Sequence, residues 1–308
     1  MRRSVRRWAA SLLPLCWLAA GGLAGAATVP DMLGRPVSLP DRPLRVVSLA
    51  PSLTEIVYAV GRGDWLVGVT EFCDFPPAAR SKPKVGGVAT PSLEQIVALR
   101  PDLVLTTAEG NSRDLLAYLT RLRVPVFALM PASLGGVVES IAAVGRALAA
   151  EAAAREAIGR LQGGMAAVQD RVRGRARPRV LYLVWADPLI AAGPATYIHD
   201  LLALAGGENI VRERTVPYPR LNWEEVIGRR PEVILVAEHR DESKRVSAVE
   251  GPAQPVWQAW QAVPAVRTGR VLAVPSNTIL RPGPRIAEGL TLLARAIHPE
   301  AWSGGGAP

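Results

Sequence analysis

Histidine and cysteine are scarce in this chain of 308 residues. Its three histidines lie far apart in the sequence, and its two cysteines are too few for a disulfide-dense scaffold or a four-cysteine zinc site. The G-x-S-x-G, Walker A and dinucleotide-binding glycine motifs are also missing. We therefore expect no catalytic residues, no metal ligands and no resident cofactor. A secreted α/β enzyme stays open as a remote alternative.

Positive charge is concentrated at the start of the chain. Four arginines within residues 2–7 precede an apolar run over residues 8–23, and small residues follow at 24–26. This order predicts a secretory signal peptide over residues 1–26 that is removed on export. The apolar run is shorter than the ~20 residues of a spanning helix, which argues against a retained membrane anchor.

Removing the signal peptide changes how the charge is interpreted. The formal net charge of +9 falls to +5, and the remaining charges are mixed without a basic block, so nucleic acid is not an expected partner. Cys16 leaves with the signal peptide, and Leu15 before it does not fit a lipid attachment site. Cys73 is then the one remaining thiol and forms no internal disulfide. With no later stretch of ~18 apolar residues, we expect no stable membrane insertion and a periplasmic location.

The rest of the chain alternates short apolar runs with helical patterns, which is typical of an open parallel sheet covered by helices. Residues 28–44 are rich in turn residues and predict a small hairpin. Ser52 is a candidate N-cap, with Glu55 as its capping-box partner, for a helix that ends near Val60. The strand-like runs occupy residues 45–49, 66–69, 102–105, 124–129, 179–184, 233–236 and 271–274.

Alanine dominates residues 138–172, where glycine and proline become rare. Apolar side chains recur there at helical spacing, and Glu151 stands four residues before Arg155. We read a shorter helix followed by a long one. The long helix is predicted over residues 147–173.

One segment of each half repeats at a constant offset of 130 residues. The two copies align residue by residue over 14 positions. They are Ser92-Leu-Glu-Gln-Ile-Val-Ala-Leu-Arg-Pro-Asp-Leu-Val-Leu and Asn222-Trp-Glu-Glu-Val-Ile-Gly-Arg-Arg-Pro-Glu-Val-Ile-Leu. An offset this long does not suit a solenoid repeat and indicates two similar lobes joined by the long helix. We therefore predict an N-terminal lobe at 27–146, a bridging helix at 147–173, a C-terminal lobe at 174–299 and a tail at 300–308.

Glu94 and Glu224 occupy the same place in the two copies. Each stands two residues after a good N-cap, Ser92 or Asn222, so both fall in the first turn of a helix. An acid there interacts favourably with the helix dipole by ~0.3–1 kcal/mol. This local role is sufficient to explain why a glutamate stands at each position. A matched pair of exposed negative charges, one on each lobe, would also suit a two-fold symmetric partner.

Aromatic residues are few, and several follow predicted strands. Phe72 and Phe75 lie in the loop after residues 66–69, Trp185 follows residues 179–184, and Tyr218 stands between two prolines. Loops at the carboxyl ends of parallel strands carry ligand sites, and aromatic rings there offer flat contact area. We expect Trp185 and Tyr218 to contact a ligand, and Phe75 to fill an apolar gap in its own loop.

Motifs along residues 28–297 occur in an order that resembles a known family. They are Asp31, Gly34-Arg35, Leu39-Pro40, Arg45-Val-Val-Ser-Leu-Ala-Pro-Ser52 with Glu55, Phe72-Cys-Asp-Phe-Pro-Pro77, Val85-Gly-Gly, Gly206-Gly-Glu-Asn209 and Val216-Pro-Tyr-Pro219. Together they resemble the iron-chelate and cobalamin class (class III) of the periplasmic binding proteins that serve ABC transporters. The later motifs are similar to those of cobalamin-binding members.

The resemblance implies an α/β fold of two lobes, each with a central, mainly parallel sheet, bridged by one rigid helix with the ligand in the cleft. It implies capture of cobalamin or another corrinoid, with haem or a ferric siderophore as the alternative cargo. The family's pocket pattern would place around the ligand Ser52, Phe72, Asp74, Trp185, Tyr218, Asn277 and Arg281.

The resemblance also implies a partner. Glu94 and Glu224 match the lobe-surface glutamates that meet arginines of an ABC permease dimer, which works with its ATPase subunits. This sequence departs from the cobalamin pattern at three pocket positions. Val88 stands where a tryptophan would be expected, Tyr218 replaces another tryptophan, and Asn277 replaces an aspartate.

Overall fold

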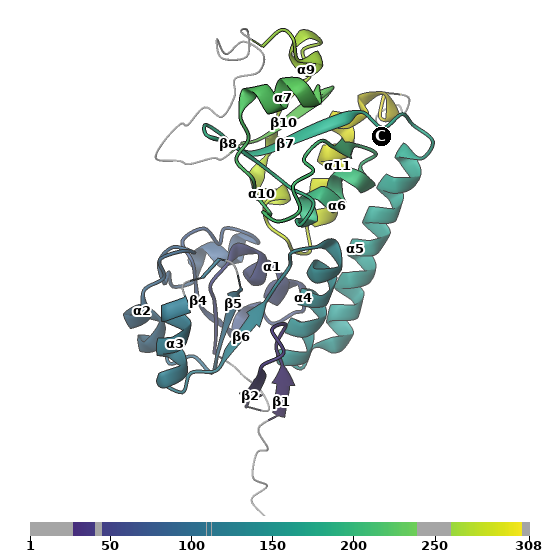
Figure 1. Ribbon diagram of the computed structural model, residues 1–308. Helices are drawn as coiled ribbons and strands as arrows, with labels where there is room; N and C mark the ends of the chain where they lie inside the picture. Colours follow the sequence, from purple (N-terminus) through teal and green to yellow (C-terminus); the bar gives the residue numbers. More distant parts are fainter. Residues whose placement is uncertain (1–26, 41–44, 109, 112, 239–259, 304–308) are drawn as a thin grey trace, which may run out of the picture.

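The computed structural model describes residues 27–40, 45–108, 110–111, 113–238 and 260–303. These residues form two α/β lobes connected along one side by a 22-residue helix, α5 (Glu151–Val172) (Figure 1). The α/β architecture with two sheet-centred lobes confirms the predicted fold class. The predicted signal peptide over residues 1–26, with Cys16, and residues 304–308 of the predicted tail lie outside the described residues.

The N-terminal lobe is built on a parallel sheet with the strand order β4–β3–β5–β6. Its strands are β3 (Val46–Ser48), β4 (Leu66–Val69), β5 (Leu103–Thr107) and β6 (Val126–Leu129). They coincide with four predicted runs and are almost wholly buried, as expected for a parallel sheet covered on both faces. The antiparallel hairpin of β1 (Ala27–Pro30) and β2 (Pro36–Leu39) precedes them. The helices are α1 (Pro51–Ala59), α2 (Leu93–Ala98), α3 (Arg113–Arg121) and α4 (Leu134–Ala147), with 3-10 turns at Gly63–Trp65 and Pro77–Ser81.

The C-terminal lobe repeats this plan with one antiparallel strand. Its sheet has the order β11–β10–β7–β8, and β9 pairs with β7. The strands are β7 (Arg179–Ala186), β8 (Leu189–Ala191), β9 (Glu208–Asn209), β10 (Val233–Glu238) and β11 (Val271–Pro275). The helices are α6 (Tyr197–Leu204), α7 (Trp223–Arg229), α9 (Pro264–Arg267), α10 (Ser276–Ile279) and α11 (Ile286–Ile297), with a 3-10 turn at Pro299–Ala301.

One hydrophobic core runs through both lobes. It includes Leu53 of α1, Phe127 of β6, Leu161 of α5, Leu201 of α6 and Leu290 of α11, all at most 2% exposed. Separating the lobes would therefore expose apolar surface to water, which is unfavourable. The bridging helix is thus part of the shared core rather than a free linker.

Two local predictions about helices need correction. Ser52 is not the N-cap of α1: Ala50 occupies that position, and Pro51, with its fixed φ, is the first helical residue. The alanine-rich region breaks between α4 and α5, where Ala149 has a φ of +46°, so the long helix begins at Glu151 rather than 147.

Trp302 of the predicted tail packs against the hydrophobic core. The ring of Trp302 lies 5.2 Å from the Arg171 guanidinium and 5.8 Å from that of Arg295. None of the helices in the described ranges combines the length and apolar character that crossing a bilayer requires.

Candidate ligand cleft

The carboxyl ends of the two parallel sheets border a cleft of about 1770 Å³. From the N-terminal lobe, Ser52 follows β3, Phe72 follows β4 and Thr107 ends β5. From the C-terminal lobe, Trp185 lies near the end of β7 and Asn277 follows β11. Ligands of open α/β sheets bind at this edge. Pockets for drug-sized molecules enclose roughly 300–1,000 Å³, so this cleft has room for a larger ligand.

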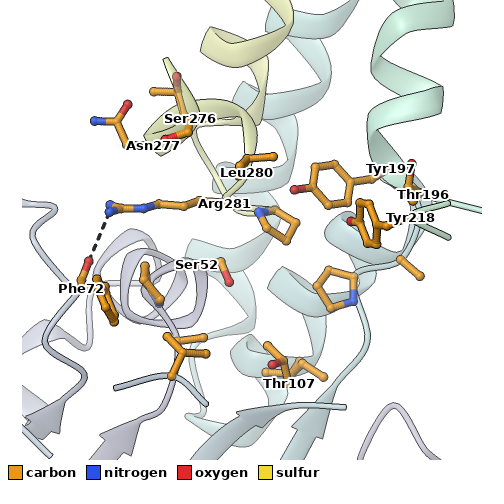
Figure 2. A pocket seen from close by; sticks show the side chains of 18 of the residues that line it. Ser52, Phe72, Thr107, Thr196, Tyr197, Tyr218, Ser276, Asn277, Leu280 and Arg281 are labelled. Atoms are coloured by element: carbon orange, nitrogen blue, oxygen red, sulfur yellow. Dashed lines mark hydrogen bonds between the residues drawn. The ribbon is translucent and has the colours of Figure 1, made fainter. Parts of the chain in front are cut away.

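The structure brings all the predicted ligand-binding residues to the lining of this one cleft: Ser52, Phe72, Asp74, Trp185, Tyr218, Asn277 and Arg281. Figure 2 shows Ser52, Phe72 and Thr107 on one side and the rings of Tyr197 and Tyr218 on another, with space between them. Val88 lines the cleft as well, at a position where a tryptophan was expected.

Three of the lining aromatics are well exposed: Phe72 (58%), Trp185 (40%) and Tyr218 (37%). Trp185 is held at one end, because its Nε1 donates a 2.7 Å hydrogen bond to the Asp187 carbonyl. The Tyr218 loop is held by the Gly193 amide, which donates to the Pro217 carbonyl at 2.8 Å. A Cβ at Gly193 would lie 3.0 Å from that oxygen, so glycine permits the close approach.

Tyrosines gather on the C-terminal wall of the cleft. Tyr197 at the start of α6 is 6% exposed and lies beside Tyr218 (Figure 2). Burial, together with the neighbouring phenols of Tyr218 and Tyr182, raises the pKa of Tyr197 well above its ordinary value. Burial raises the pKa of Tyr182 as well. Both phenols therefore stay neutral at physiological pH and present dipoles rather than charges.

Arg281 joins the two lobes at the floor of the cleft. Its Nη1 donates to Asp74 Oδ1 at 2.5 Å. Its Nη2 donates to the Phe72 carbonyl at 3.2 Å, the hydrogen bond that is dashed in Figure 2. Partial burial works to raise the pKa of Asp74, but the hydrogen bond and the positive charge of Arg281 outweigh it and lower that pKa below its ordinary value. Asp74 is therefore a stable carboxylate partner for Arg281.

Glu55 and Arg285 lie behind this pair, and their interaction was not predicted from the sequence. Arg285 donates to both Glu55 oxygens, Nε to Oε2 at 2.9 Å and Nη2 to Oε1 at 2.6 Å. Its guanidinium also lies 3.9 Å from the centre of the Phe75 ring, so Phe75 supports a charge rather than only filling a gap. The capping-box pattern supplied a local explanation for Glu55, and no signal in the sequence pointed to a partner 230 residues away.

The charged groups that line the cleft are mixed in sign. Three are carboxylates and two are guanidiniums: Glu71, Asp74, Glu238, Arg80 and Arg281. Among the described lining residues there is no histidine and no cysteine. No group of three or more His, Cys, Asp or Glu suited to a metal ion occurs in the described ranges.

Cys73, His199 and Asp200 are residue types used in nucleophilic catalysis, but here each contacts other residues of the fold. Cys73 is 1% exposed, and its sulfur lies 3.1 Å from the hydroxyl oxygens of Thr54 and Thr70. His199 Nδ1 lies 3.2 Å from Asn209 Nδ2, and Asp200 accepts a 3.0 Å hydrogen bond from the Leu134 amide. These contacts give each side chain a packing or capping role within the fold.

Glu94 and Glu224 are exposed in the first turns of α2 and α7. Ser92 caps α2, since its Oγ accepts a 3.2 Å hydrogen bond from the Gln95 amide. At α7 the full capping box is present between Asn222 and Glu225. The caps use other side chains, so both glutamates point into solvent from matching places on the two lobes.

Comparison with known proteins reveals an extended likeness. A profile of the family described as "Periplasmic binding protein" matches residues 46–278. A "Cobalamin-binding protein" of Halobacterium salinarum is 34% identical over 282 residues, 88% of this chain and 74% of the relative.

Two solved structures share the fold. The periplasmic vitamin B12 binding protein of Vibrio cholerae superposes with a TM-score of 0.71 at 28% identity, covering 85% of this chain and 98% of that one. A periplasmic heme-binding protein from Roseiflexus sp. RS-1 has a TM-score of 0.73 at 28% identity, covering 84% and 99%.

Proposed function

The chain belongs to the periplasmic binding protein family, and from this premise we propose that it captures cobalamin or a related corrinoid and delivers it to an ABC importer. The observation that carries the proposal is the cleft of about 1770 Å³ with exposed aromatic rings from both lobes. A flat macrocycle with apolar faces and a polar rim matches that surface. The cobalamin- and vitamin B12-binding names of relatives support the same cargo.

The mechanism is binding without a bond-making step, so the protein is not an enzyme and the corrinoid is cargo rather than a resident cofactor. Phe72, Trp185 and Tyr218 would cover the faces and edges of the macrocycle, each large apolar side chain contributing about 1.5–3 kcal/mol when fully buried. Around the rim, polar contacts would come from Ser52, Asp74, Asn277 and Arg281.

Haem is the second candidate, because the heme-binding Roseiflexus structure superposes as well as the vitamin B12 binding one. Haem iron is held in proteins by His, Cys, Met or Tyr, and the described lining offers Met130, Tyr197 and Tyr218. The haem carboxylates, however, would need surplus positive charge, whereas the described lining carries two guanidiniums, Arg80 and Arg281, against three carboxylates, and Arg281 is already bound to Asp74. That pairing favours the corrinoid.

Delivery requires a membrane partner, and we propose that Glu94 and Glu224 dock onto an ABC permease dimer. One exposed carboxylate on each lobe fits a partner with two symmetry-related cationic sites. Residues 1–26 would direct export to the periplasm and be removed. The intact mass of protein purified from the periplasm checks this: a chain that starts near Ala27 is expected, and a retained Met1 or a diacylglycerol adduct would refute it.

Calorimetric titration of the purified protein tests the cargo. We expect cyanocobalamin to bind with a stoichiometry of one per chain, and haem and ferric siderophores to bind more weakly. No heat with any corrinoid, beside clear binding of haem or a siderophore, would refute the corrinoid proposal and leave the family assignment intact.

A further inference from the structure

Glu55 is a buried carboxylate that belongs neither to a helix cap nor to the cleft lining. Its side chain is only 2% exposed. Both its oxygens accept hydrogen bonds from Arg285, and Oε1 also lies 3.5 Å from Arg281 Nη1. The carboxylate comes from α1 in the N-terminal lobe, and both arginines come from the segment before α11 in the C-terminal lobe.

Together with Asp74, these residues form a closed interlobe cluster of four charges. Glu55 and Asp74 supply two negative charges, and Arg281 and Arg285 supply two positive ones. Asp74 and Arg281 face the cleft, while Glu55 and Arg285 lie behind them. The two arginine side chains are 16% and 14% exposed and that of Glu55 is 2% exposed, so water screens these three charges weakly, whereas Asp74 is 46% exposed at the cleft surface.

We propose that Glu55 sets the charge selectivity of the cleft: by balancing Arg285 and Arg281, it makes the cleft prefer a macrocycle with an uncharged amide rim to one with a carboxylate rim. The inference rests on the proposed function and names the chemical class of ligand that the same site accepts. Glu55 is a positioning residue, because it acts on the ligand through Arg281.

The physical reason is the cost of an unbalanced buried charge. Without the Glu55 charge, two guanidiniums would share only Asp74, and a weakly hydrated positive charge would remain at the cleft floor. A ligand carboxylate would then become its natural counter-ion through charge-assisted hydrogen bonds. When Glu55 is charged, the four charges of the cluster cancel. A carboxylate of the ligand then has no surplus positive charge to pair with and is repelled by Asp74.

The test compares two ligands with the same ring: cobalamin, and a corrinoid whose peripheral amides have been hydrolysed to carboxylates. The unmodified protein should prefer cobalamin. Glu55→Gln should shift the ratio of the two affinities by about tenfold or more towards the carboxylate form, the size of one hydrogen bond to a charged group. The shift should shrink at high salt. Glu139→Gln, which removes an exposed carboxylate on α4, is the matched control and should leave the ratio unchanged.

Two further variants separate charge from structure. Glu55→Gln combined with Arg285→Gln leaves one carboxylate and one guanidinium, so the charges balance again. This double variant should prefer cobalamin, as the unmodified protein does. Arg285→Gln alone leaves two carboxylates against Arg281 and should shift the ratio the opposite way, which keeps the test decisive if Glu55→Gln does not fold. If every variant lost affinity for both ligands equally, the cluster would only hold the lobes together, and the proposal would be overturned.

The same measurements distinguish failure of the corrinoid proposal from failure of the role proposed for Glu55. If the unmodified protein binds no corrinoid but binds haem, the corrinoid proposal falls, and the same comparison is made with haem and its dimethyl ester. A preference for the free carboxylate form in the unmodified protein, unchanged in Glu55→Gln, would overturn the role of Glu55.

Discussion

Neighbouring side chains in the loop after β4 have different surroundings. Cys73 is buried between Thr54 and Thr70, whereas Phe72 and Asp74 on either side of it line the cleft. The alternation brings two side chains to the cleft lining while the third anchors the loop. The ligand contacts proposed for Phe72 and Asp74 would therefore come from a loop that the buried Cys73 anchors.

The aromatic rings provide the first prediction. Trp185→Ala and Tyr218→Ala should each weaken corrinoid binding by about 1–3 kcal/mol, because each removes a large apolar contact from the ligand. Tyr118→Ala on α3, an aromatic that is 51% exposed and does not line the cleft, is the control. Calorimetry measures all three affinities, and unchanged affinity in both cleft variants would show that these rings only pack within their own lobe.

An ion pair next to α7 provides the second prediction. Hydrogen bonds from Arg229 outweigh slight desolvation and lower the pKa of Glu213 from 4.5 to about 2. A depressed pKa in the folded state adds stability that is fully present above pH 4.5 and is lost as the pH falls towards 2. Glu213→Gln should therefore lower the melting temperature by about 1–3 °C at pH 7.

That difference should shrink as the pH falls from 5 towards 2, because Glu213 itself then becomes neutral. Melting curves followed by circular dichroism give the comparison, with Glu156→Gln on α5, where the carboxylate is 75% exposed, as the control. A melting difference that stays constant down to pH 2 would argue against the ion pair as its cause.

At the scale of single elements, the glycines of α5 have different surroundings. A Cβ built on Gly164 would lie 3.0 Å from the Cβ of Ala287 in α11, whereas a Cβ on Gly159 meets nothing within 4 Å. Gly164 therefore lets α11 of the C-terminal lobe pack closely against the bridging helix. Gly159 serves no contact of this kind.

This contrast allows a matched comparison within one helix. Gly164→Val and Gly159→Val introduce the same side chain, but only the former pushes α5 and α11 apart. We expect Gly164→Val to have a free energy of unfolding about 1–3 kcal/mol below that of Gly159→Val, the usual cost of overpacking. Urea denaturation measures both, and equal stabilities would mean that the two helices adjust without cost.

The sequence was informative where local pattern decides structure. The strands of the N-terminal sheet and β7, β10 and β11 coincide with predicted runs, because apolar, β-branched segments between helices have few other ways to be buried. The short strands β8 and β9 were not predicted. The cleft residues could be anticipated because the carboxyl ends of parallel strands meet at one edge. The break at Ala149 could not, since an alanine with a φ of +46° looks like any other alanine in the sequence.

Glu55 illustrates the same limit at the site. A serine followed three residues later by a glutamate is the usual pattern of a capping box, and this local reading was wrong. The partner of Glu55 is Arg285, 230 residues further along the chain, and only the packing of α1 against the C-terminal lobe brings them together. Long-range ion pairs of this kind leave no local pattern.

At the scale of the whole molecule, the lobes are held together by more than α5. The continuous core and the Glu55–Arg285 pair both cross between them, and a Cβ at Gly283 would lie 3.3 Å from the Ser52 carbonyl. Large closure around a ligand would break these contacts. We therefore expect only small lobe movements, so that the two glutamates proposed to dock onto the permease, Glu94 and Glu224, keep nearly the same separation with and without cargo.

The docking proposal leads to a prediction for the assembled transporter. Glu94→Arg combined with Glu224→Arg should abolish complex formation with the permease while corrinoid affinity stays unchanged, because two like-charge contacts would replace two ion pairs. Docking of the unmodified protein should weaken with salt, since exposed pairs are screened over ~8–10 Å at physiological ionic strength. Co-purification with the permease provides the measurement.

A second double variant controls for net charge. Glu151→Arg combined with Glu156→Arg changes the total charge equally, but on α5. It should dock normally. Transport at the usual rate by the Glu94 and Glu224 double variant would leave their interaction with the helix dipole as the whole explanation of these residues.

A competition between candidate ligands tests most directly whether the protein binds a corrinoid. The purified protein is exposed to an equimolar mixture of cobalamin, haem and a ferric siderophore, separated from free ligand, and its absorbance spectrum is recorded. We expect the red spectrum of one bound corrinoid per chain and no Soret band. A Soret band or a siderophore spectrum without corrinoid absorbance would contradict it.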